Sequence, residues 1–166
     1  MVTKIDRPTQ TFVYDTYIRT TPERLWEALT NGDFSEKYWK GYRIEMEQRA
    51  GGRLRIQPPQ GGRVIWNDSG KVLACDPHRK LVYEFSLNEA PEVSAKRQGP
   101  SRVTYELQPM GEMVRLRLIH ENLLEEDTEK DLNSQRGINN GWPAILSSLK
   151  SLLETGQAIN LTACAS

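Results

Sequence analysis

The sequence predicts an α+β domain with two layers, in which a curved antiparallel sheet of about six or seven strands wraps a long C-terminal helix. Three observations predict it. Strand-like segments follow one another through most of the chain and are separated by short turn sequences, as in antiparallel sheets. Two short helical segments come directly after the first strand. Apolar residues at helical spacing near the C-terminus form one face, which a sheet must cover.

The N-terminal elements are predicted from alternation and capping. Residues 11–19 are rich in aromatic and β-branched side chains at alternating positions, which predicts a strand. Thr21-Pro22 begins a helix, because threonine caps free amides and proline fits the first helical position. Asp33 and Glu36 have the spacing of a capping box, which predicts a second short helix over about 34–39.

The middle of the chain is predicted to be a run of strands. They cover about 42–48, 52–57, 63–75, 81–87, 102–108 and 113–121. Gly51-Gly52 supplies a hairpin turn between the first two of these strands. Residues 67–70 have turn composition, which allows the third of them to be a hairpin instead. Residues 88–100 are polar and contain two prolines, which predicts a loop.

The last helix is predicted over about 128–154. Its apolar face consists of residues three or four positions apart: Ile138, Trp142, Ile145, Leu149 and Leu152. Pro143 lies within it and predicts a bend near residues 139–143. We expect one domain over residues 11–156, with flexible segments at 1–10 and 157–166.

Composition excludes several classes of protein. The 166 residues carry 22 basic and 22 acidic side chains, and this balance argues against nucleic-acid binding, which depends on basic contacts to phosphate. Mean hydropathy is −0.63, and no apolar run approaches the length of a membrane span. The first residues lack the apolar core of a signal peptide, and the two distant cysteines predict reduced thiols. We therefore expect a cytoplasmic protein.

Recognised catalytic motifs are absent from the sequence. It contains no zinc-protease, Walker, nucleophile-elbow or dinucleotide-binding motif. Two histidines and two distant cysteines do not make a zinc site, so neither a metal nor a cofactor is expected.

Seven residues are predicted to line a pocket between the sheet and the last helix. They share an inward position, either on one face of a strand or on the apolar face of the helix. They are Tyr83, Phe85, Tyr105, Leu118, His120, Ile138 and Trp142.

Each of these candidates also has a purely structural interpretation. His120 is either an acid or base in a cavity, because the pKa of histidine moves easily across neutrality, or a hydrogen-bonded histidine at a strand end. Trp142 is either a pocket wall or a core residue. Inward tyrosines either give the pocket an apolar wall with a hydroxyl tip or simply fill the core.

Four segments carry a resemblance to a known family. They are T-P-E-R-L-W-E-A-L-T at 21–30, G-K-V-L-A-C-D-P-H-R-K-L-V-Y-E-F at 70–85, S-R-V-T-Y-E-L-Q-P at 101–109 and G-W-P-A-I-L-S-S-L-K-S-L-L-E-T-G at 141–156. The chain resembles the START-like (SRPBCC) helix-grip superfamily, and within it the C-terminal domain of activators of a heat-shock-protein ATPase and their bacterial homologues. The resemblance implies a sheet gripping the C-terminal helix with a cavity between them. Function stays open, because carriers, cyclases, hydrolases and co-chaperones share this scaffold.

The expected function is that of a cytoplasmic binding protein for a small, largely apolar or aromatic molecule, as a monomer or a homodimer. The chain is expected to be a binder more than an enzyme. The alternative is a cyclase or dehydratase in which His120 and Tyr105 transfer protons on a bound carbonyl compound. A stress-related co-chaperone is the third possibility, although a chaperone partner is not expected from a resemblance to the C-terminal domain alone.

Overall fold

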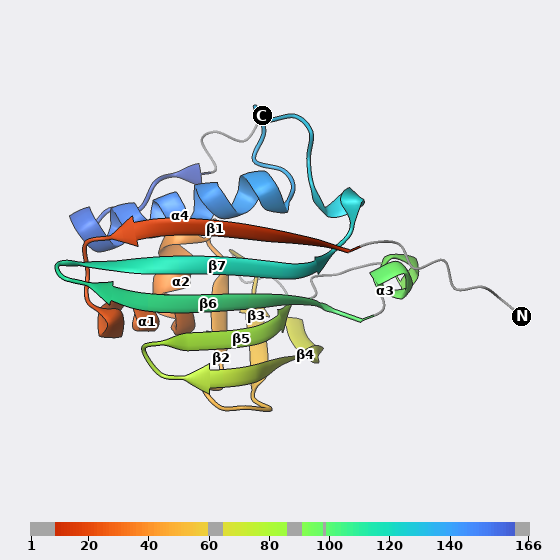
Figure 1. Ribbon diagram of the computed structural model, residues 1–166, viewed down its shortest axis with the longest axis horizontal. Helices are drawn as coiled ribbons and strands as arrows, with labels where there is room; N and C mark the ends of the chain where they lie inside the picture. The colour runs from red at the N-terminus through yellow and green to blue at the C-terminus, as the bar shows by residue number, and fades with distance from the viewer. Residues whose placement is uncertain (1–8, 60–64, 86–90, 98, 162–166) are drawn as a thin grey trace, which may run out of the picture.

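The computed structural model describes residues 9–59, 65–85, 91–97 and 99–161. The predicted α+β class is confirmed: a seven-stranded antiparallel sheet curls around helices that lie on one of its faces (Figure 1). The strands are β1 (Gln10–Ile18), β2 (Arg43–Met46), β3 (Arg53–Gln57), β4 (Ile65–Asp76), β5 (Lys80–Phe85), β6 (Ser101–Met110) and β7 (Met113–Leu123). The helices are α1 (Pro22–Thr30), α2 (Gly32–Tyr38), α3 (Pro91–Arg97) and α4 (Ile138–Thr155), with a 3₁₀ turn, η2 (Glu125–Asp127).

The strand order is β1-β7-β6-β5-β4-β3-β2, so the first strand pairs with the last. Figure 1 shows β1, β7 and β6 side by side, with α4 running along β1. Alternate residues of β7 point to the helices and are buried, including Val114, Leu116, Leu118 and His120. The core therefore lies between the sheet and the helices, where the sequence places it. In the described part of the chain, no helix has both the length and the apolar character needed to cross a membrane.

The two short helices meet at Asn31, which is the last capping residue of α1 and the first of α2. The hydroxyl of Thr21 accepts a hydrogen bond from the Arg24 amide at 3.2 Å, which confirms the predicted start of α1. The predicted capping box of α2 is wrong. The helix begins at Gly32, and the side chain of Asn31 caps it by accepting from the Asp33 amide at 2.9 Å. Asp33 instead lies in the first turn, where its charge suits the helix dipole.

The last helix begins at residue 138 rather than at 128. Gly137 has φ +77, a left-handed conformation that a right-handed helix cannot contain. The segment before it is held by side-chain bonds: Asn139 accepts from the Glu129 amide and donates to the Glu129 carbonyl, both at 2.9 Å. These two bonds give the amide and the carbonyl of Glu129 hydrogen-bond partners outside a helix.

Two other expectations about the middle of the chain are corrected. Residues 91–97 of the predicted loop form α3, with Pro91 at the first helical position, while residues 88–90 and 98 lie outside the described residues. β4 is one continuous strand and not a hairpin, although residues 63 and 64 of the predicted strand lie outside the described residues. Arg53 pairs with Lys71 and Leu54 with Asn67, so residues 68–70 form a bulge.

The chain beyond α4 folds back onto this helix. Ser148 donates to the Ile159 carbonyl at 3.2 Å and accepts from the Ile159 amide at 3.1 Å. Leu161 is buried in the core. Residues 157–161 of the predicted tail thus have defined contacts, and residues 1–8 and 162–166, with Cys164, lie outside the described residues. The predicted domain boundaries and the bend at Pro143 stay predictions.

Candidate functional site

Five of the seven predicted pocket residues form one group of contacting rings. Tyr83 and Phe85 come from β5, Tyr105 from β6, His120 from β7 and Trp142 from α4. Their ring centroids lie 5.7–6.4 Å apart in the pairs that touch. The register of the sheet produces this grouping, because β6 lies between β5 and β7 and the inward positions of all three strands meet α4.

The other two predicted residues lie at the margin of these rings. Leu118 is fully buried and pairs with Tyr105 across β7 and β6. Ile138 is the first residue of α4 and is partly buried against the core.

Trp39 is the member that sequence reasoning missed. It closes α2, and its ring lies 5.1 Å from that of Trp142, edge to face, and 6.4 Å from that of Phe85. A residue at the end of a short helix has no periodicity to place it, so the sequence carried no usable signal. We call Trp39, Tyr83, Phe85, Tyr105, His120 and Trp142 the aromatic cluster.

His120 is held at both ring nitrogens. The indole N–H of Trp142 donates to Nδ1 at 3.0 Å, so Nδ1 carries no proton and Nε2 carries it. Nε2 then donates to the Ser101 hydroxyl at 2.8 Å, and Ser101 donates to the Phe85 carbonyl at 2.5 Å. This chain of bonds joins α4 to β7, β6 and β5 and leaves no polar atom of the imidazole free.

The environment keeps the imidazole of His120 neutral. Burial disfavours the imidazolium and lowers its pKa from 6.5 to about 4, with the nearby Asp127 acting in the opposite direction. A protonated ring would also lose the bond from Trp142, because Nδ1 would become a donor. The geometry therefore gives His120 a structural role in the described state.

The two inward tyrosines meet at their hydroxyl groups. Tyr83 Oη and Tyr105 Oη lie 3.0 Å apart, and both residues are 1% exposed. Burial raises the pKa of both phenols, so both stay neutral. A third buried phenol, Tyr38, donates to the Ala28 carbonyl at 2.8 Å.

The aromatic cluster has a closed side and a side open to solvent. Tyr83, Tyr105, His120 and Trp142 are at most 3% exposed, whereas Trp39 and Phe85 are only partly buried. The ring contacts fill the space between the sheet and α4 in this conformation. A ligand can enter there only if the two partly exposed rings move aside.

A buried ion pair lies next to the cluster. Arg97 of α3 is 2% exposed and donates to the Asp127 carboxylate, one of the two bonds being 3.1 Å long, and to the Asn122 carbonyl at 3.2 Å. Burial opposes ionisation of Asp127, but the bonds from Arg97 and from the Leu124 amide outweigh it and lower the pKa. The pair ties α3 to η2 at the end of the sheet where β7 ends (Figure 1).

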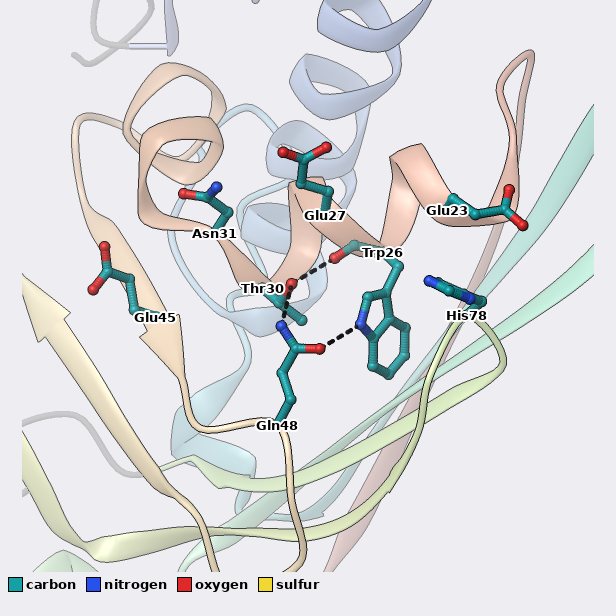
Figure 2. Close-up of a pocket in the computed structure, with 8 residues that line it drawn as sticks. All are labelled: Glu23, Trp26, Glu27, Thr30, Asn31, Glu45, Gln48 and His78. Carbon is teal, nitrogen blue, oxygen red and sulfur yellow. Dashed lines mark hydrogen bonds between the residues drawn. The ribbon is translucent and has the colours of Figure 1, made fainter.

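A surface hollow lies away from the aromatic cluster. It has a volume of about 490 Å³ and is lined by Glu23, Trp26, Glu27, Thr30, Asn31, Glu45, Gln48 and His78 (Figure 2). Gln48 accepts from the indole of Trp26 at 2.9 Å and donates to Thr30 at 3.4 Å, so these polar groups satisfy one another. The three carboxylates that line this hollow favour the binding of cations. None of the seven predicted residues lines it.

A second hollow, of about 210 Å³, lies beside β2 and β3. It too is lined by none of the seven predicted residues. Among the described residues, no group of three or more histidine, cysteine, aspartate or glutamate side chains is placed to hold a metal ion.

The curled sheet around α4 defines a protein of the helix-grip class. Residues 19–154 match the model of the family described as Activator of Hsp90 ATPase homolog 1-like protein, and the chain belongs to this family. No curated protein matches it.

Solved structures share this fold. Protein MLL2253 from Mesorhizobium loti is 27% identical, with a TM-score of 0.64, over 87% of this chain and 96% of that one. The Aha1 dimer from Colwellia psychrerythraea is 21% identical, with a TM-score of 0.66, over 90% of this chain and 99% of that one. ChR145 from Cytophaga hutchinsonii is 23% identical, with a TM-score of 0.64, over 87% of this chain and 93% of that one.

Proposed function

We propose that the protein is a cytoplasmic binder of a small, largely apolar molecule, held between β5, β6, β7 and α4 at the aromatic cluster. The observation that carries this proposal is the partial exposure of Trp39 and Phe85 above four deeply buried rings. Rings packed only for stability need no opening to solvent, whereas a binding site needs an apolar wall and a way in. Outward movement of Trp39 and Phe85 would uncover the ring of Trp142, which both of them contact, and the ring of Tyr83, which Phe85 contacts.

The same geometry favours binding over catalysis. A proton-transferring histidine must have a nitrogen within reach of the substrate. Both nitrogens of His120 already serve Trp142 and Ser101, and the hydroxyl of Tyr105 bonds to that of Tyr83. Proton transfer by His120 and Tyr105 would require both sets of bonds to break first.

Native mass spectrometry of gently purified protein tests the proposal. We expect an added mass that is released on denaturation and that chemical analysis identifies as a largely apolar molecule. Trp39→Ala should weaken rebinding of that molecule about tenfold, because it removes a wall of the site. Trp26→Phe is the matched control, since Trp26 lies at the hollow of Figure 2 and outside the cluster.

Failure would take a definite form. An unliganded mass, together with no shift of the Trp142 indole signal when aromatic hydrocarbons or ketones are added, contradicts a binding site at the cluster. Equal losses in Trp39→Ala and Trp26→Phe would assign the effect to general stability.

We further propose that the protein forms a homodimer, as the Colwellia protein does in its solved structure. The outer face of β1 supports this, because Val13 and Tyr17 are 53% and 44% exposed on an edge strand. The same native spectrum measures it. A mass of one chain at micromolar concentration would contradict the dimer.

A further inference from the structure

Arg115 of β7 forms no ion pair or hydrogen bond with another described residue. It lies on the outer face of the sheet, since Val114 and Leu116 on either side of it are buried on the inner face. Its Nε atom is shielded from solvent and has no hydrogen-bond partner in the part of the chain that the structure describes. The neighbouring Arg117, in contrast, donates to both carboxylate oxygens of Asp15 at 2.8 Å. A shielded donor without a partner needs an explanation.

Exposed apolar side chains surround Arg115 on the outer face. Tyr17 lies directly opposite it on β1, and Met113 precedes it by two residues on the same face of β7. Met110 pairs with Met113 across the β6–β7 hairpin. Tyr17, Met110 and Met113 are 44%, 42% and 41% exposed. Tyrosine, methionine and arginine are the residue types enriched at protein–protein interfaces, and we call these four residues the outer patch.

The segment between η2 and α4 has the complementary character. Leu132 is 77% exposed, and the exposed carboxylate of Asp131 precedes it. The segment is held in place, because Asn140 donates to the Asp131 carbonyl at 2.9 Å and the Asn133 amide donates to the Asp131 carboxylate at 3.0 Å. A fixed apolar side chain beside a carboxylate matches an arginine that lacks a partner and has apolar neighbours.

The two surfaces lie at opposite ends of one long side of the molecule. β1 ends beside the β6–β7 hairpin, whereas the segment between η2 and α4 follows the other end of β7 (Figure 1). β1 is an edge strand, so a second copy can approach along it. A two-fold axis across this side reverses the second copy, and each outer patch then faces the segment between η2 and α4 of the other chain.

We infer that the outer patch binds a second copy of this chain. Asp131 of the partner subunit pairs with Arg115. Leu132 of the partner subunit packs against Tyr17 and Met113, and two-fold symmetry makes each contact twice. The chain carries 22 basic and 22 acidic residues, so no net charge drives two copies apart. The inference rests on the proposed homodimer and adds the two surfaces that form it.

A charge exchange tests the ion pair. We would measure the dissociation constant of the full-length dimer by sedimentation equilibrium. Arg115→Glu and Asp131→Lys should each weaken the dimer on the order of 100-fold, because each brings like charges together. Both substitutions in one chain reverse the pair and should restore most of the affinity. Asp131→Asn should weaken the dimer about tenfold, because it removes the charge but keeps the acceptor for the Asn133 amide.

A second comparison tests the apolar contact. Leu132→Ser should weaken the dimer about tenfold, because it removes the side chain that packs on the outer patch. Leu73→Ser is the matched control, since Leu73 is 41% exposed on β4, with three strands between β4 and β1, and should leave the dissociation constant unchanged. Leu132 is exposed within its own chain, so this variant keeps the test decisive even if a substitution on β7 prevents folding.

The outcomes separate the inference from the proposed homodimer. A dimer that is unaffected by Asp131→Lys and Leu132→Ser overturns the inference and leaves a homodimer formed by other surfaces. A loss in both charge-reversed variants that the double variant does not recover also overturns it, because Asp131 and Arg115 then act separately. The mass of a single chain throughout the concentration series overturns the homodimer and the inference together.

Discussion

Acid should destabilise this protein through His120. The residue is 1% exposed, and its Nδ1 accepts the hydrogen bond from Trp142. Protonation turns that acceptor into a donor, so the native state resists it. Burial is the main cause of the low pKa of about 4, against an ordinary value of 6.5. The unfolded chain therefore binds this proton first as the pH falls.

The size of the effect follows from the two pKa values. Above pH 6.5 both states hold a neutral ring, and the pH has no effect through this group. Between 6.5 and 4 only the unfolded state is protonated, and stability falls by about 1.4 kcal/mol for each pH unit. The difference between the two pKa values therefore lowers the free energy of unfolding by about 3 kcal/mol by pH 4. That loss is a large part of the stability of an ordinary domain.

Urea unfolding at about pH 7.5 and about pH 4 measures this loss. Other groups also titrate in this range, so the comparison is with His120→Gln, whose amide keeps one donor and one acceptor but cannot take up the proton. The loss of stability between the two pH values should be about 3 kcal/mol smaller in the variant. His78→Gln, at the exposed histidine, is the matched control. An equal loss in the unmodified protein and in His120→Gln would refute the reasoning.

Three further substitutions test the contacts that hold the fold. Arg97→Met should lower the free energy of unfolding in urea by about 3 kcal/mol, because it leaves the carboxylate of Asp127 without its buried partner. A smaller loss in Arg97→Met than in Asp127→Asn would contradict this. Thr21→Ala should cost about 1 kcal/mol and lower the melting temperature, since it removes the cap of α1, and an unchanged midpoint would exclude that role. Gly156→Ala should cost roughly 1–2 kcal/mol in the same assay, because φ there is +82, and no loss would show that the backbone relaxes.

The sequence was sufficient where local periodicity and burial coincide. In β7, alternate residues are buried because one face of the strand meets the helices, so parity alone placed Leu118 and His120 inward. The start of α1 followed from one capping threonine and one proline, which act within a single turn. The apolar spacing over Ile145, Leu149 and Leu152 likewise predicted the buried face of α4.

The failures occur where contacts between distant residues decide the structure. The start of α4 depends on Gly137 and on the bonds between Asn139 and Glu129, which no periodicity reveals. The run 67–70 has the composition of a turn, but pairing with β3 makes it part of a bulged strand. α3 is docked by Arg97 against Asp127, 30 residues away, and the polar sequence around it predicts only a loop.

Hydrogen-bond partners separate the roles of residues that share one sequence pattern. His120, Tyr83 and Tyr105 all occupy inward positions with a polar tip, and sequence alone allows each to be core, ligand contact or catalyst. Their hydrogen-bond partners distinguish them: His120 bonds to Trp142 of α4 and to Ser101 of β6, whereas the hydroxyl groups of Tyr83 and Tyr105 bond to each other. A buried group with all its bonds made stabilises one conformation, because breaking those bonds leaves buried polar atoms without partners. On the proposed function, the bonds of His120 fix the walls of the cluster, and the ligand meets the side where Trp39 and Phe85 are partly exposed, which the rebinding assay on Trp39→Ala tests.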